Sequence, residues 1–195
     1  MAVRIITPPK GTLVSLNDLK RHLRVSWTDE DDYINALNLA AQNLVETWTQ
    51  SRYLAQVLEQ VLDHWNDPMV LPVAPAAGSI GASITSVVYT ASDGSTQTLD
   101  PSYYWDRPHG ETRAVVRRWF VMYPWLGDGA ERVVIRFAIT GLQGDVPPGI
   151  QHAIKLLVSH WREHREAVSG VDGRDSAAPL PLGVRELLTA ERWDG

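Results

Sequence analysis

The strongest hydrophobic pattern in the chain lies between Pro147 and Val168. Apolar residues recur there at intervals of three and four, which is the spacing of a helix with one buried face. They are Ile150, Ala153, Ile154, Leu157, Trp161 and Val168. Pro147 and Pro148 suit the start of a helix, because a residue in the first turn needs no N–H for the hydrogen-bond ladder. The sequence therefore predicts a helix over 148–168.

Two further helices are predicted in the first quarter of the chain. Ser15 suits the cap of the first, near 15–24, with Asp18 three residues on. The second is predicted near 28–50, where acidic residues 29–32 occupy the first turn and are favoured by the helix dipole. These acids could hold a cation, but a solvated helix start is the preferred interpretation. The expected apolar stripe consists of Tyr33, Leu37, Ala40, Ala41, Leu44 and Trp48.

The pattern between about 53 and 141 indicates strands. Residues 54–62 are rich in Val, Leu and Gln without Gly or Pro, which favours a long strand. Asp93 and Gly94 separate the runs Ile80–Tyr89 and Thr96–Leu99, which is typical of a hairpin. Further strands are predicted over 103–105, 114–120 and 132–139. We expect an antiparallel, meander-like sheet of about five or six strands.

The end of the chain differs from the rest. Residues 169–181 are small, polar and rich in Pro and Gly, which is typical of a flexible linker. The amphipathic helix predicted after them is too short to be stable alone in water, so it should dock on its own domain or on another chain. The predicted fold is therefore α+β. One domain over 1–168 carries a β insertion over 53–141, and a linker and tail follow over 169–195.

One motif suggests catalysis. His160, Glu163 and His164 match the H-x-x-E-H pattern of zinc peptidases, in which both imidazoles face one side of a helix and the glutamate activates water. A third protein ligand is also required. The downstream carboxylates lie in the predicted linker and tail, apart from Glu166. The alternative interpretation places both histidines beside the buried stripe near a helix C-terminus, where imidazolium is favoured. We prefer the alternative and predict no catalytic residue, metal or cofactor.

Five arginines in neighbouring predicted strands could form a basic strip facing phosphate or an acidic partner. The preferred alternative is that they pair with nearby acids on solvated strand faces. They are Arg113, Arg117, Arg118, Arg132 and Arg136.

Composition narrows the function classes. The chain has no cysteine, so disulfides, thiolate zinc sites and cysteine nucleophiles are excluded. Its net charge of −5 argues against a free-standing nucleic-acid binder, which usually has a basic surface. No apolar run is long enough for a membrane span, and no secretory signal is expected at the N-terminus. The eight tryptophans are many for this length, and some are expected at partner interfaces.

The order of these segments resembles the phage head–tail connector family, whose members are also called adaptor or head completion proteins. The family includes members in phage-like gene transfer particles. The resemblance covers nearly the whole chain and departs from the family at Gly78–Gly81, which leaves the strand register there open. The matching segments are Leu19–Val25, Asp29–Trp65, Leu71–Pro75, Ile84–Gly94, Tyr123–Gly141, Val146–Val168 and Leu180–Leu188.

The resemblance implies a non-enzymatic structural protein at the head–tail interface of a virion, made in the bacterial cytoplasm. Such a protein is expected to form a dodecameric ring beneath the portal protein, to extend the DNA channel, and to join a downstream connector, stopper or tail protein. DNA would pass through the lumen without sequence-specific binding, and no membrane partner is expected. The family's C-terminal segment is expected on the portal; the matching residues here are Leu182, Val184, Leu187, Leu188 and Trp193.

Four other functions stay open at this point. One is a stand-alone ligand-binding β module, which would remain monomeric. A tail terminator or a tail-tube component would also form rings, but it would bind the tail and not the portal. A zinc hydrolase would use the H-x-x-E-H motif and bind a metal.

Overall fold

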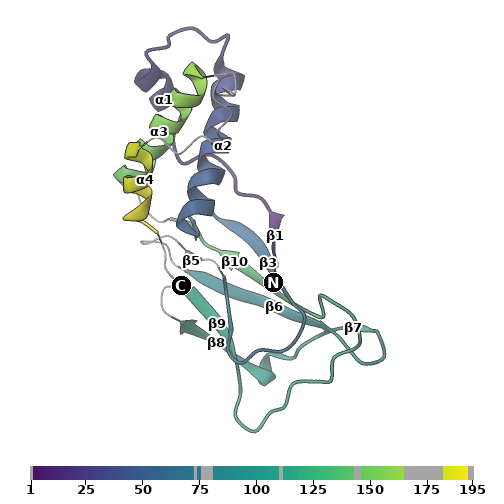
Figure 1. The fold of residues 1–195 in the computed structure, drawn as a ribbon. Helices are drawn as coiled ribbons and strands as arrows, with labels where there is room; N and C mark the ends of the chain where they lie inside the picture. Colours follow the sequence, from purple (N-terminus) through teal and green to yellow (C-terminus); the bar gives the residue numbers. More distant parts are fainter. Residues whose placement is uncertain are drawn as a thin grey trace, which may run out of the picture. The chain divides into compact units, whose positions relative to one another are not determined.

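A computed structural model describes residues 2–72, 74–75, 81–109, 112–142, 146–164 and 182–192. The chain divides into two compact units, each with its own internal contacts. The β unit consists mainly of Gln50–Gly144, with Met1–Lys10, and the helical unit consists of Gly11–Thr49 and Asp145–Arg192. Figure 1 shows strands in the first and helices in the second. The α+β class is therefore confirmed. The predicted linker over 169–181 lies outside the described residues, and the division into a domain over 1–168 and a tail stays a prediction.

The helices of the described residues begin close to the predicted positions. The Ser15 hydroxyl caps the first of them by accepting the Asp18 N–H at 3.1 Å. The third ends at Glu163, with His164 as its C-cap, and the remainder of its predicted range, 165–168, lies outside the described residues. The four helices are α1 (Leu16–Leu23), α2 (Asp31–Thr49), α3 (Pro148–Glu163) and α4 (Leu182–Thr189).

The predicted face of α3 is confirmed, because Ile150, Ala153, Ile154 and Leu157 are fully buried. Two of the acidic residues near the start of α2 pair with cations of neighbouring helices. Asp31 pairs with Lys20 at 2.6 Å, and Glu30 pairs with Arg162 at 2.6 Å.

The predicted buried face of α2 is wrong. Of the expected stripe only Ala41 is fully buried; the buried residues of α2 also include Ile34 and Val45 and several polar side chains. The reason is hydrogen bonding to the segment before α1. The Asn38 side-chain amide donates to the Val14 backbone carbonyl at 2.8 Å, and the Gln42 side-chain oxygen Oε1 accepts the Leu13 N–H at 3.0 Å. The backbone groups of Leu13 and Val14 need hydrogen-bond partners, so the buried face of α2 includes polar side chains that supply them.

The strands form two antiparallel sheets and one short parallel pair. The five-stranded sheet has the order β1 (Ala2–Thr7), β3 (Gln56–Leu62), β10 (Val133–Ile139), β6 (Ala82–Thr90), β7 (Thr96–Thr98). The three-stranded sheet has the order β4 (Met69–Val70), β9 (Thr112–Arg117), β8 (Tyr104–His109). The parallel pair joins β2 (Ser51–Arg52) to β5 (Ala74–Pro75), and the 3₁₀ helix η1 covers Pro101–Tyr103.

The sheet is not the predicted meander. The last strand in the chain, β10, lies in the middle of the five-stranded sheet, between β3 and β6. Its alternate residues Val133, Ile135, Phe137 and Ile139 are buried. A strand with four buried apolar residues therefore lies inside the sheet with a partner on each side, and the polar β7 takes an edge.

The core of the β unit joins both antiparallel sheets. Leu58 and Phe137 of the larger sheet share one hydrophobic cluster with Met69 and Val115 of the smaller sheet, and all four are buried. Alternation along β3 and β10 puts every second side chain into this cluster and the others on the opposite face.

Candidate interaction surfaces

The H-x-x-E-H residues lie at the C-terminal end of α3. The rings of His160 and His164 are 4.6 Å apart, and the His164 Nδ1 lies 3.0 Å from the His160 carbonyl oxygen. Among the described residues no group of three or more His, Cys, Asp and Glu side chains could hold a metal. The possible ligands Glu166, Asp172, Asp175 and Asp194 lie outside the described residues. The described part of the chain thus supplies two adjacent imidazoles without a third ligand.

A second histidine pair comes together only in the folded helical unit. His22 of α1 and His152 of α3 are far apart in sequence, and their rings meet edge to face at 6.4 Å. Burial lowers the pKa of His22, and the nearby His152 and Lys155 lower it further. His22 therefore favours the neutral imidazole, and the contact between the two rings is explained by helix packing.

The five arginines of the β block do not form a free basic strip. Three pair with carboxylates, as the preferred interpretation expects, and the other two donate to backbone carbonyls instead. The ion pairs are Arg113 with Asp106, Arg117 with Asp67 and Arg136 with Glu59. The backbone acceptors are Tyr104 for Arg118 and Gly127 for Arg132.

The predicted tail helix forms and packs inside the helical unit. α4 contacts α3 and α2, and Figure 1 shows it beside α3. Val184 and Leu188 are fully buried. Leu187 is partly buried, beside Gly149 at the start of α3. The Leu182 side chain and Trp193 lie outside the described residues. Their contact with a portal stays a prediction.

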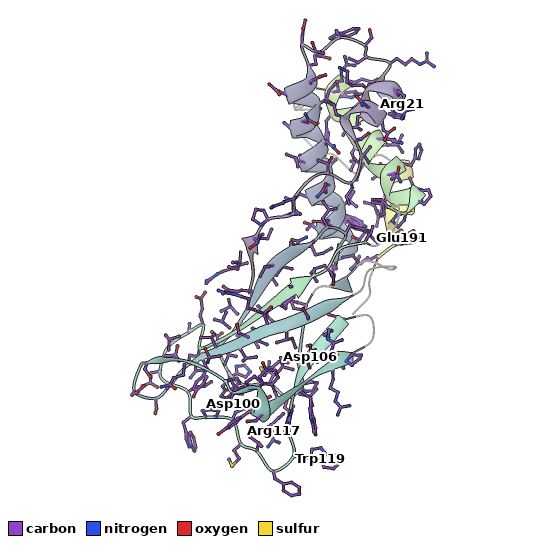
Figure 2. All side chains as sticks on the ribbon, turned by 180° about the vertical axis from the view of Figure 1, so that it is seen from behind. Arg21, Asp100, Asp106, Arg117, Trp119 and Glu191 are labelled. Carbon is purple, nitrogen blue, oxygen red and sulfur yellow. The ribbon has the colours of Figure 1, made fainter. Side chains whose placement is uncertain are left out.

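Four exposed large apolar side chains of the described residues gather in a loop that the strand prediction did not anticipate. We call residues 118–126 the apex loop. A strand was expected to continue to Phe120, but β9 ends at Arg117 and the chain turns at Trp119 and Phe120. Four large side chains of the loop are exposed: Trp119 (79%), Phe120 (103%), Met122 (79%) and Trp125 (85%). In Figure 2, Trp119 extends beyond the end of the β unit.

The base of the apex loop is fixed to the β unit. The Arg117 guanidinium donates to the Val121 carbonyl at 2.8 Å, and the Trp65 indole N–H donates to the Pro124 carbonyl at 2.9 Å. The Tyr123 ring stacks on Trp65 with centroids 4.5 Å apart. Burial raises the pKa of Tyr123, with Asp67 adding to the effect, so the phenol stays neutral. The inward side chains hold the loop while the apolar ones face outward.

One sequence signal could have identified this loop. Residues 119–125 contain four aromatic side chains close to Pro124. They lack the alternation of polar and apolar residues that is typical of a half-buried strand. A strand pattern was inferred because aromatic residues favour strands. The turn depends on contacts with Trp65, which is distant in sequence, and no local pattern encodes those contacts.

A search for membrane-spanning helices among the described residues finds none of sufficient length and apolar character.

No protein-family model matches the chain, and a sequence search of curated proteins finds no match. Solved structures do match. A chain in the virion of a native gene transfer agent particle is 22% identical, with a TM-score of 0.68, and the match covers 100% of this chain and 99% of that chain.

Two further matches come from particle necks. A chain in the neck of an empty particle, computed with C6 symmetry, is 22% identical with a TM-score of 0.72. A chain in the neck of a native particle, computed with C12 symmetry, is 23% identical with a TM-score of 0.69. Both matches cover 100% of this chain and 99% of the other. Over its whole length, the chain therefore has the fold of protein chains found in the necks of gene transfer agent particles.

Proposed function

We propose that the protein is a structural subunit of a head–tail connector ring, in a phage or a phage-like gene transfer particle. The observation that carries this proposal is the fold match over the full length of the chain to subunits of necks with C6 and C12 symmetry. In this proposal about twelve copies form a ring under the portal protein, extend the DNA channel and receive the next connector, stopper or tail protein. The protein performs no reaction.

We assign portal binding to α4 and the residues beside it. The large apolar residues of this segment are Leu182, Val184, Leu187, Leu188 and Trp193. Val184 and Leu188 are buried in the chain's own helical unit, so binding through them requires α4 to leave α3. Exposing two such side chains costs roughly 3–6 kcal/mol. The portal must therefore offer an apolar groove that recovers this free energy.

The charge distribution suits a channel through which DNA moves. Each phosphate neutralised by a free cation adds affinity, which would slow passage. In the β unit, Arg113, Arg117 and Arg136 are paired with carboxylates, and the whole chain carries −5. We infer that DNA passes without sequence-specific binding.

Mass measurement of the protein mixed with assembled portal tests the proposal. We expect many copies of the protein on each portal particle. The double substitution Leu187→Asp with Leu188→Asp should abolish attachment, because it puts charge on the apolar face of α4. A matched control, Thr189→Asp with Ala190→Asp, changes exposed positions of the same segment and should attach normally.

Circular dichroism must show that the variant stays folded. Attachment by a folded Leu187 and Leu188 variant would mean that α4 is the wrong surface. A wild-type protein that ignores the portal and binds tail proteins would support the tail-terminator or tail-tube alternative.

A further inference from the structure

We propose that the apex loop of one copy docks into an apolar pocket on the β unit of a second copy. This contact would be the head-to-tail joint between neighbouring subunits. The inference rests on the proposed ring and names the surfaces that close it.

The apex loop has the properties of an interface anchor. Aromatic and methionine side chains are enriched in the buried centres of interfaces, and this loop exposes two Trp, one Phe and one Met. Its base is hydrogen-bonded and stacked, so little backbone conformational entropy remains to be lost on binding. Phe120 adopts φ +64°, a region that non-glycine residues rarely occupy and that often marks functional sites. This backbone conformation accompanies a fully exposed ring.

The pocket lies where β1 ends and β3 begins, on the same unit but on the other sheet. It encloses about 310 Å³, and its lining includes Pro8, Lys10, Ala55, Val57 and Ala138. Val57 and Ala138 are partners across β3 and β10. They alternate with the core residues Leu58 and Phe137, so they lie on the sheet face away from the core. The apolar residues on this face can contact an aromatic side chain, and Lys10 beside them can make a cation–π contact with it.

Two different surfaces on one chain are what a closed ring needs. Subunits that meet head to tail use one surface to bind the previous copy and another to bind the next. The apex loop follows β9 of the three-stranded sheet, and the pocket is lined by β3 and β10 of the five-stranded sheet, within the same compact unit. Each is therefore held in place by the β core and is presented to other molecules as a separate site.

The expected area also fits association in a ring. Three aromatic side chains bury roughly 450–750 Å² in all, against roughly 800 Å² per partner in a standard interface. A single joint should be weak, and closing the ring should strengthen it through multivalency. The net charge of −5 disfavours an anionic lipid surface as the occupant. It also predicts that self-association becomes stronger with salt, because salt screens the repulsion between copies.

Two complementary variants test the joint. Trp119→Ser with Phe120→Ser removes the loop's aromatic tip, and Ala138→Trp fills the pocket. At concentrations where the wild-type protein associates, each variant alone should be a monomer by analytical ultracentrifugation. An equimolar mixture, measured at concentrations raised until the weak single joint is populated, should form one-to-one heterodimers and nothing larger, because each variant supplies the one surface that the other lacks.

Two controls separate this effect from a general loss of apolar surface or of folding. Trp27→Ser removes another exposed tryptophan, and Gln97→Trp adds one at an exposed strand position. Both should associate like the wild type, and circular dichroism should show all variants folded. A monomeric wild type, assembly by either single-surface variant, or a mixture without heterodimers would overturn the joint.

The outcome is distinguishable from failure of the proposed function. Portal attachment without heterodimer formation would contradict only the proposed loop-to-pocket contact. Heterodimers without portal attachment would remove the connector role and keep the contact. Loop variants that self-associate normally but no longer bind a tail-side protein would assign the loop to that partner and overturn the inference. Loop-dependent binding of the wild-type protein to anionic vesicles would overturn it too.

Discussion

Gly141 and Gly94 have nearly the same backbone angle, φ +79° and +80°, but different surroundings. A Cβ at Gly141 would lie 2.7 Å from the Ala55 backbone nitrogen, whereas a Cβ at Gly94 would meet no atom within 4 Å. Backbone atoms of a packed strand entry cannot rotate away as a flexible side chain can. The two glycines therefore separate the cost of a positive φ from the cost of a close approach.

We predict that Gly141→Ala destabilises the β unit more than Gly94→Ala does. Both substitutions incur the left-handed backbone cost of about 1–2 kcal/mol, and Gly141→Ala adds an overpacking cost of about 1–3 kcal/mol. Hydrogen exchange of β10 amides measures the free energy of opening in each variant. Equal losses would mean that the backbone near Ala55 relaxes at no cost.

At the scale of elements, the hairpin of β6 and β7 was predictable and its turn is stabilised as its sequence suggests. The Asp93 carboxylate accepts the Ser95 N–H at 2.9 Å and the Ser95 hydroxyl at 2.6 Å. The hydroxyl and then the backbone N–H lower the pKa of Asp93 from its ordinary 3.8. Because the folded pKa is below the unfolded one, the carboxylate contributes stability above pH 3.8. That contribution is lost as the pH falls through the lower folded value.

Asp93→Asn should therefore remove the part of the folding stability that depends on ionisation of Asp93. The wild type should be the more stable protein above pH 3.8, and the difference should shrink as the pH falls below that value, where Asp93 takes up its proton. Urea unfolding of both proteins across this range measures the difference. Ser95→Ala removes the hydroxyl donor and should weaken the same dependence; a difference that grows in acid would contradict this account.

Other elements were harder to predict from local sequence. The extent of β9 and the buried face of α2 were both predicted wrongly. In each case the deciding contact is distant: Trp65 holds the loop after β9, and the backbone at Leu13 and Val14 draws the polar side of α2 inward. Periodicity reports only which side chains share a face, not which backbone groups elsewhere need hydrogen bonds.

At the scale of the whole molecule, each unit has its own core. Ile154 is fully buried among the helices and Phe137 is fully buried between the sheets. Contacts are denser within the units than between them. We therefore expect each unit to unfold locally as a whole, without the other.

We predict that Ile154→Ala costs about 2–5 kcal/mol and accelerates amide exchange in α2 and α3, while β3 and β10 keep their protection. Phe137→Ala should cost about 3–5 kcal/mol and give the reverse pattern. Hydrogen exchange with mass spectrometry reads both units in one experiment. Faster exchange throughout the chain in either variant would mean that the units unfold together.

The sequence by itself determined the helices and most of the strands, the starts of α1 and α3, the buried face of α3 and the hairpin at Gly94, because propensity, capping and periodicity are local. Only the tertiary structure decided the central place of β10, the polar face of α2 and the exposed apex loop. It also decided the packing of α4 and the missing third ligand beside His160 and His164 among the described residues. Each of these depends on contacts between residues far apart in the chain, whose pairing is set by the total burial and hydrogen bonding of the folded units.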